Sequence, residues 1–274
     1  MLTLLPQFKC LNIMKPSFPK FVLLIAATFV FTAFAFSKPK REIYQLTVYQ
    51  YSTVAQETIL TNYFKNALVP ALHKLGYKNI GVFKSLANDT SAIKMMYLYL
   101  PIKSLEDKTT IKEKLNTDNE YQTAGADYIN ASYTNPAYTR MEIIVLKAFP
   151  LAPKMQLPNL KAPKNERVYE LRSYESASEK IFANKVQMFN EGGEIDIFKR
   201  INANAVFYSE VIAGSHMPNL MYMTCYENKA DRDAHWKVFS ADPAWKTLSA
   251  KPEYQHNVAH IDITFLQPLD CSDF

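Results

Sequence analysis

Three side chains that could do chemistry occupy every second position of one short segment of the chain. They are the acidic Glu170, the basic Arg172 and the phenolic Tyr174. In an extended strand such residues point to the same face. A guanidinium group beside carboxyl and phenol groups can bind an anionic or polar ligand and can shift the pKa values of its neighbours. This segment is therefore the first candidate for a binding site.

Other polar groups fall on strands that we expect to flank this segment. His260 and Asp262 belong to one such strand and Tyr222 to another. The predicted ligand-binding residues are Glu170, Arg172, Tyr222 and Asp262. In a catalytic version His260 or Tyr174 is the general base and Arg172 steadies an enolate-like anion. The alternative is a hydrated salt-bridge network that fixes how two sheets dock.

Signals for metals, phosphates and catalytic nucleophiles are weak. No HExxH, CxxC or GxSxG motif occurs, and His256 and His260, four residues apart, straddle an expected change from helix to strand. With only 6 glycines, the chain also lacks a glycine-rich phosphate loop. We expect no metal and no cofactor from these patterns.

The chain repeats itself at an offset of about 125 residues. Tyr44, Leu46 and Tyr49 fall on Tyr169, Leu171 and Tyr174. The same offset lays Met96-Tyr97-Leu98 on Met221-Tyr222-Met223, and Val82-Phe83 on Phe207-Tyr208. We interpret this as a duplication, with a first module over 41–148 and a second over 167–269.

Four prolines divide the two copies, and they predict a semi-rigid linker over 149–166. Each copy shows the order strand, helix, strand, strand, helix, strand. The expected strands are 43–50, 80–84, 94–100 and 140–147, then 168–174, 205–211, 220–227 and 258–266. The expected helices are 54–75, 105–130, 179–201 (interrupted near Gly192-Gly193) and 230–250. This predicts an α+β fold of two tandem ferredoxin-like βαββαβ modules.

Each predicted sheet has one face covered by helices and one uncovered. We assign Tyr44, Leu46 and Tyr169 to the helix-covered face, and Glu170 and Arg172 to the other. Uncovered faces of this kind usually meet a partner. The two modules are therefore expected to pair as a dimeric α/β-barrel arrangement, within one chain or between two, around an interior pocket.

An aromatic run in the second copy predicts a second feature. Trp236 and Phe239 lie on one helix face, and Asp242-Pro243 is an N-cap with proline at the first helical position, before Trp245. We interpret the run as an aromatic clamp that anchors the helix to the core.

The segment 168–174 and the run Trp236-x-x-Phe239-x-x-Asp242-Pro243-x-Trp245 resemble those of the NIPSNAP family. The stretch 68–77 is similar to the end of that family's first helix, while the first copy lacks the tryptophans. The resemblance implies a ferredoxin-like, dimeric α/β-barrel fold, in a superfamily that includes cofactor-independent monooxygenases and haem-degrading enzymes. It implies no catalytic set, because shared fold does not imply shared activity.

The start of the chain predicts export. Lys15 and Lys20 precede an apolar run over 21–36, and Ala33-Phe34-Ala35 suits a signal peptidase, which predicts a signal peptide over 1–35 with cleavage after Ala35. The alternative is an uncleaved membrane anchor. Met14 is an alternative start. We expect a secreted or periplasmic protein that meets the membrane only through this segment.

Net charge bears on the kind of partner that we expect, and the cysteines bear on whether a disulfide forms. Removal of residues 1–35 takes away three lysines and no acidic residue, which lowers the formal net charge from +5 to +2 and leaves little support for a nucleic-acid partner. Export permits a disulfide between Cys225 and Cys271, but one lies within an expected strand and the other in the tail, so we expect two free thiols.

Three functions remain open from the sequence. The first is an exported module that binds a small organic or anionic ligand, as a homo-oligomer or through pairing of its own modules. The second is a cofactor-free oxygenase- or isomerase-like enzyme. The third is an assembly protein without a pocket.

Overall fold

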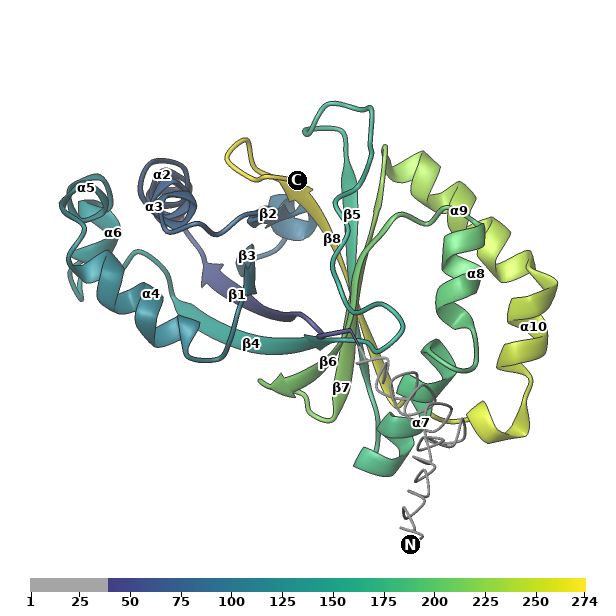
Figure 1. The fold of residues 1–274 in the computed structure, drawn as a ribbon. Coiled ribbons are helices and arrows are strands. Elements are labelled where there is room, and N and C mark those ends of the chain that lie inside the picture. Colours follow the sequence, from purple (N-terminus) through teal and green to yellow (C-terminus); the bar gives the residue numbers. More distant parts are fainter. Residues whose placement is uncertain (1–38) are drawn as a thin grey trace, which may run out of the picture. The chain divides into compact units, whose positions relative to one another are not determined.

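The computed structural model describes residues 39–274, in which Lys40–Phe274 forms one compact unit. The expected signal peptide, 1–35, lies outside the described residues. Eight strands form a closed barrel in the order β1-β3-β2-β8-β5-β7-β6-β4, and every pair within it is antiparallel. Helices α2–α6 and α7–α10 cover opposite sides of this barrel (Figure 1). The fold is therefore mixed α/β, with one barrel closed by one chain.

The first half of the chain follows the expected order of elements. Its elements are β1 (Ile43–Tyr51), α2 (Val54–Tyr63), a π-helical turn (Phe64–Leu68), α3 (Val69–Lys74), β2 (Gly81–Ser85), a 3₁₀ turn (Leu86–Asp89), β3 (Lys94–Ile102), α4 (Asp107–Asn116), α5 (Asn119–Ala124), α6 (Ala126–Ile129) and β4 (Arg140–Ala148). The single helix expected over 105–130 is three helices. Asp118 starts α5 because its side chain accepts hydrogen bonds from the backbone N–H groups of Glu120 and Tyr121.

The second half has the same order. Its elements are β5 (Val168–Glu175), α7 (Glu179–Phe189), α8 (Glu194–Arg200), β6 (Ala205–Ala213), β7 (Asn219–Tyr226), α9 (Lys229–Ala241), α10 (Pro243–Ser249), a 3₁₀ turn (Pro252–Tyr254) and β8 (His260–Pro268). Asp242 caps α10 ahead of Pro243, as the sequence predicts. Cys225 and Cys271 are both free thiols, also as predicted. Among the described helices, none has the length and apolar character needed to cross a membrane.

The barrel interior is a packed core, and it corrects our assignment of the sheet faces. The interior holds Tyr44, Leu46, Tyr169 and Leu171, together with apolar side chains from all eight strands. The helix-covered faces instead carry Tyr49 and Leu98 in the first half, and Tyr174 and Tyr222 in the second. The alternation was predicted correctly but the two faces were exchanged. Both faces of each sheet are buried, so hydrophobicity alone does not distinguish them.

The offset of about 125 residues that the sequence suggested holds in the structure only for the first strands, β1 and β5. Tyr44 and Tyr169 both face the barrel interior. In the third strands the pairing partners differ, because Thr47 pairs with Leu98 while Arg172 pairs with Tyr222. Leu98 and Tyr222 are thus the equivalent positions, one residue away from the match that the sequence suggested.

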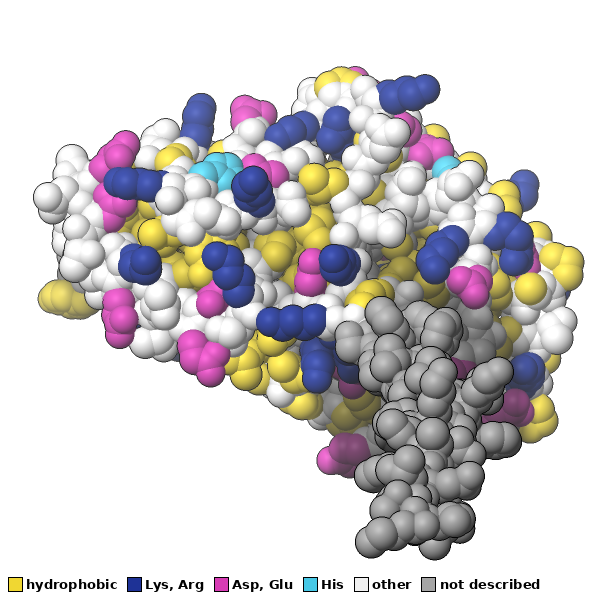
Figure 2. Space-filling model, in the orientation of Figure 1, with side chains coloured by type: hydrophobic (Ala, Val, Ile, Leu, Met, Phe, Trp, Pro, Cys, Tyr) yellow, Lys and Arg dark blue, Asp and Glu magenta, His cyan; other side chains and the backbone are white. Residues whose placement is uncertain are grey.

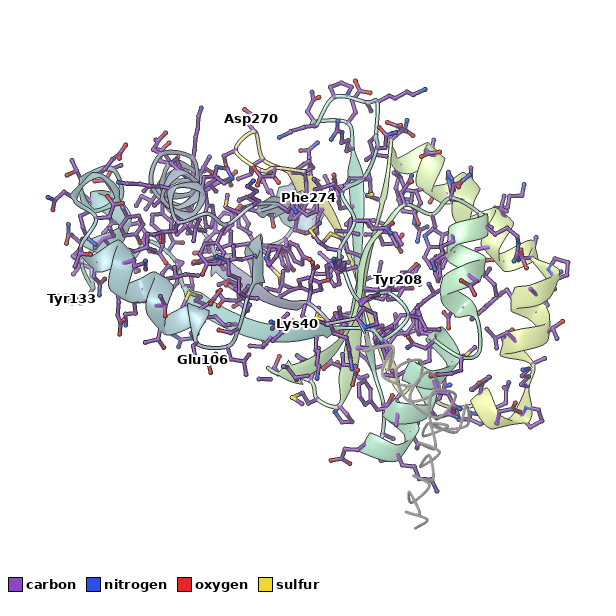
Figure 3. The ribbon with its side chains drawn as sticks, in the orientation of Figure 1. Lys40, Glu106, Tyr133, Tyr208, Asp270 and Phe274 are labelled. Carbon is purple, nitrogen blue, oxygen red and sulfur yellow. The ribbon has the colours of Figure 1, made fainter. Side chains whose placement is uncertain are left out.

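The two ends of the barrel differ. At one end the C-terminal Phe274, 2% exposed, packs its ring against Phe83, Tyr99 and Tyr169 with centroids 5.4, 5.8 and 5.9 Å away. Figure 3 shows Phe274 beside β2 and β8. The other end opens into a hollow of about 360 Å³ lined by residues of β1, β3, β4, β5, β7 and β8. We call this hollow the open mouth; Asp262, Ser173, Asn219 and His216 are among its lining residues.

Candidate functional site

Glu170 is the centre of a buried charge cluster between β5 and α9. Its side chain is fully buried, and its Oε1 accepts hydrogen bonds from Arg172 Nε and Arg232 Nη2, each at 2.7 Å. Oε2 accepts from Arg232 Nε and from Trp236 Nε1, also at 2.7 Å each. Arg232 thus binds the carboxylate with two parallel bonds, the geometry that guanidinium groups favour. Both oxygens of Glu170 are fully engaged by the protein.

Arg172 is equally occupied. Its Nε and Nη2 contact Glu170, and its Nη1 donates to the Tyr174 hydroxyl at 3.0 Å. The guanidinium lies 3.6 Å from the centre of the Trp236 ring. Burial alone would lower the pKa of Arg172, but Tyr222, Tyr174 and Glu170 raise it overall, so this side chain stays charged. Each of the three guanidinium nitrogens therefore already contacts an oxygen of the protein.

The Tyr174 hydroxyl extends the cluster to Tyr222, 2.8 Å away. Burial raises the pKa of Tyr222 well above its ordinary value, which keeps that phenol protonated. Four predicted site residues, Glu170, Arg172, Tyr174 and Tyr222, therefore do meet. Their contacts join the sheet to α9, which differs from the network between two sheets that we considered.

A second buried ion pair lies nearby, between Lys185 of α7 and Glu194 of α8. Lys185 Nζ is 2.9 Å from Glu194 Oε2, and both side chains are at most 5% exposed. Burial raises the pKa of Glu194, and the Lys185 charge offsets this in part. The helix layer of the second half thus rests on charge pairs as well as on apolar contacts.

His260 and Asp262 lie apart from this cluster, contrary to our prediction. In the β5–β8 pairing, Arg172 faces Ile263 and Glu170 faces Phe265, whereas Ser173 faces Asp262 and Glu175 faces His260. Because side chains alternate across a strand, His260 and Asp262 point to the opposite face, at the open mouth. His260 Nε2 is 3.1 Å from Asp262 Oδ1, and both side chains are more than half exposed. A base at His260 and an anion-binding Arg172 consequently share no site.

A cavity larger than the open mouth lies elsewhere, in a region that the sequence presented only as a linker. We call it the linker cleft: about 530 Å³ lined by 151–156 of the linker, Phe198 and Lys199 of α8, and 202–208 leading into β6. One of its lining residues, Tyr208, is labelled in Figure 3. Phe198 and Tyr208, both buried, give it an apolar floor, while Val206 and Phe207 also line it but belong to the barrel core.

The walls of the linker cleft are fixed by backbone hydrogen bonds. Phe149 N–H donates to the Tyr208 carbonyl at 2.9 Å and Gln156 N–H to the Val206 carbonyl at 2.8 Å. Asn202 and Asn204 adopt positive φ, 54° and 42°, which asparagine tolerates better than most residues. The Asn202-Ala203-Asn204 sequence was the available signal for a sharp turn here, but nothing in it indicated that the linker folds back over it.

The charged side chains among the described residues that line this cleft are all basic. Its lining includes Lys154 and Lys199 and the amides Gln156, Asn202 and Asn204, with no Asp or Glu. Lys199 also contacts Asp196 at 3.4 Å on the outer surface. Elsewhere on the visible face, basic and acidic side chains are interspersed (Figure 2). The linker cleft therefore combines an apolar floor with a cationic rim.

Comparisons with known proteins support the fold. A proposed monooxygenase from Lactobacillus acidophilus NCFM matches with 12% identity and TM-score 0.53, over 84% of this chain and 94% of its own. A proposed monooxygenase from Fusobacterium nucleatum matches with 6% identity and TM-score 0.54, over the same shares of the two chains. Among the curated proteins none matches.

The comparisons with the NIPSNAP family each cover less than half of the chain. An uncharacterised NIPSNAP-like domain protein from Burkholderia xenovorans matches with 20% identity and TM-score 0.37, over 40% of this chain and 91% of its own. The NIPSNAP family model matches residues 169–273, the segment that carries β5, the aromatic clamp and β8. The second half of this chain is a NIPSNAP domain.

Proposed function

We propose that the protein binds a small organic anion in the linker cleft. The observation that carries this proposal is the cleft itself, whose volume of about 530 Å³ falls within the range of small-molecule sites. An apolar floor favours a hydrocarbon or aromatic body, because its burial removes apolar surface from water. The rim lysines, Lys154 and Lys199, favour a carboxylate or similar charged group at the opening.

The charge cluster around Glu170 has a structural role in this proposal. Arg172 was the predicted anion-binding residue, but its nitrogens already contact Glu170 and Tyr174. Likeness to proposed monooxygenases supports a fold that can house small molecules, not a reaction. We therefore propose binding without assigning catalysis.

A thermal-shift screen of the full chain tests the proposal. The ligands are aromatic and aliphatic carboxylates, each paired with its neutral amide. At least one carboxylate should raise the melting temperature in a concentration-dependent way, because a ligand that binds only the native state stabilises it. Its amide should do so less.

Variants of the two rim lysines test whether the ligand binds in the linker cleft. The double variant Lys154→Gln with Lys199→Gln should weaken the best carboxylate by about tenfold, which corresponds to ~1.4 kcal/mol. The matched control is Lys237→Gln, an exposed lysine on α9 outside the cleft. The proposal fails if no carboxylate stabilises the protein, or if the double variant binds as the control does.

Two further proposals concern organisation and location. We propose that the chain is a tandem of two ferredoxin-like modules; supporting this, the barrel order reads β4-β1-β3-β2 and then β8-β5-β7-β6. We also propose export after cleavage behind Ala35, supported by the apolar run and small residues of that segment. N-terminal sequencing of the protein from fractionated cells should begin at Phe36; an uncleaved start in the membrane fraction would contradict it.

A further inference from the structure

Three potential metal-binding side chains meet beside the open mouth, which one of them, Asp262, lines. Glu175, His260 and Asp262 each offer a ligand atom, and these atoms all lie within 4.8 Å of one another. Within the described part of the chain this is the one such cluster of three. The linker cleft is lined by none of these residues, so the cluster is separate from the proposed anion site.

The strands hold these residues in place. Glu175 is paired directly with His260 across β5 and β8, and Asp262 lies two residues further along β8, on the same face as His260. Residues directly opposite on antiparallel strands have Cβ atoms roughly 5 Å apart. Two ligands of one zinc ion, each about 2.1 Å from it, lie roughly 3 to 4 Å apart. Modest side-chain rotation is enough to bring the three atoms to that spacing.

Two buried oxygens at the cluster accept no hydrogen bond from the described residues. Asn219 is 2% exposed and lines the open mouth, and its Oδ1 has no hydrogen bond while its amide donates to Ser173 Oγ. Glu175 Oε1 is fully buried and also has no hydrogen bond. His216 Nδ1 lies 2.9 Å from that oxygen, but the contact does not meet hydrogen-bond geometry. Buried oxygens without a donor are costly, and a cation or its bound water would satisfy them.

The charges of the mouth are complementary to a cation. Glu142 and Asp262 line it and Glu175 adjoins it, whereas no lysine or arginine of the described residues lines it. One imidazole with two carboxylates suits a divalent first-row metal better than Ca²⁺ or Mg²⁺, which prefer oxygen ligands alone. Catalytic zinc sites commonly have three protein ligands and leave one position open to the solvent.

We propose that Glu175, His260 and Asp262 bind a divalent transition-metal ion, with Zn²⁺ as the reference ion, at the open mouth. His216, whose Nδ1 lies 2.9 Å from Glu175 Oε1, is placed to act as an outer partner of this ligand. The open side of the ion faces the hollow, where water or a ligand oxygen completes its coordination. Sequence spacing gave no sign of this site because Glu175 and His260 are far apart along the chain.

Calorimetric titration of the full chain with ZnCl₂, after removal of metal with a chelator, tests the site. The expected result is one Zn²⁺ per chain. His260→Gln and Asp262→Asn should each weaken binding by about tenfold or more, since each removes one of three ligands. Both residues are largely exposed, so both variants should fold as the wild type does by circular dichroism.

His73→Gln is the control, because His73 Nε2 lies 3.0 Å from Asp273 Oδ2 in a partly exposed His–Asp pair outside the mouth. It should leave zinc binding unchanged, as should the Lys154→Gln, Lys199→Gln double variant. A visible spectrum of the Co²⁺-loaded protein should change in His260→Gln and not in His73→Gln. The proposal is overturned if the wild type does not bind Zn²⁺ at millimolar concentration, if both mouth variants bind as His73→Gln does, or if Ca²⁺ binds more tightly than Zn²⁺.

Discussion

The two halves of the barrel use the same strand position in different ways. In the first half, Gln45 and Thr47 form one side-chain hydrogen bond of 3.1 Å beneath α2–α6. In the second half, the matching residues are Glu170 and Arg172, and the carboxylate accepts four hydrogen bonds. The first helix layer is held mainly by aromatic and apolar packing, whereas the second combines such packing with a buried charge cluster.

The difference originates in the second helix of each half. In the second half α9 supplies Arg232 and Trp236, which complete the coordination of Glu170. In the first half the corresponding layer is closed by tyrosines, with Tyr63 stacked on Tyr128 at 3.7 Å and edge-on to Tyr121 at 6.0 Å. Removing one ring from an aromatic layer affects mainly the contacts of that ring. Removing one member of a buried charge cluster also leaves the remaining charges unpaired.

The largest expected effect is that of Glu170→Gln. Among the described residues Glu170 is the one carboxylate that Arg172 contacts, so the change leaves this buried guanidinium without its counter-charge, whereas the half-buried Arg232 keeps only its contact with Asp233. Breaking a buried pair in this way typically costs about 3–5 kcal/mol. Urea unfolding followed by circular dichroism should show this loss.

Gln45→Ala in the first half is the matched control. It removes one hydrogen bond between neutral groups, so the free energy of unfolding should fall by about 1 kcal/mol. Equal losses in the two variants would show that the charge cluster is no more interdependent than the neutral layer.

A smaller effect, with a defined pH dependence, is expected for the Lys185–Glu194 pair. Lys185→Met removes the charge that offsets the burial of Glu194, so the pKa of Glu194 should rise further. A carboxyl whose pKa is raised in the folded state binds a proton that the unfolded chain has already lost. Its contribution to stability is therefore present below the unfolded pKa and is lost as the pH rises through the folded pKa.

The free energy of unfolding, measured from pH 4 to pH 8, should consequently fall more steeply with rising pH in Lys185→Met than in the wild type. At neutral pH the variant should be less stable by about 3 kcal/mol. Adding Glu194→Leu should remove the excess pH dependence and restore most of the stability. If the pH profile of Lys185→Met runs parallel to that of the wild type, a raised pKa of Glu194 is not the cause of the stability lost in the variant.

Local patterns predicted the elements of this fold well. Alternation located the strands to within a few residues, and the Asp242-Pro243 signal placed the start of α10. The sheet faces were not predictable, because Tyr44 and Tyr49 are equally buried on opposite faces of β1. The break of the first-half helix at Asp118 was missed, although aspartate is a strong N-cap.

The candidate sites were predicted only where neighbours along one strand form them. Glu170, Arg172 and Tyr174 come together because alternation alone puts them on one face. Asp262 was assigned to the wrong face with the rest of its strand. The open mouth and the linker cleft depend on the register between distant segments and on a linker folding back, and neither follows from local pattern.

The smallest expected effects come from a pair of tyrosines, one in each helix layer. Tyr174 Oη contacts both Arg172 and Tyr222, whereas Tyr63 Oη contacts Tyr121 at 2.8 Å. Tyr174→Phe removes a hydrogen bond to a charged group and should cost about 2 kcal/mol, while Tyr63→Phe should cost about 1 kcal/mol or less. Both changes keep the ring, so packing is nearly constant and the difference reports the hydroxyl contacts. Urea unfolding of the two variants at one pH measures it, and a larger loss for Tyr63→Phe would place the more sensitive polar contact in the aromatic layer, reversing the contrast between the two halves.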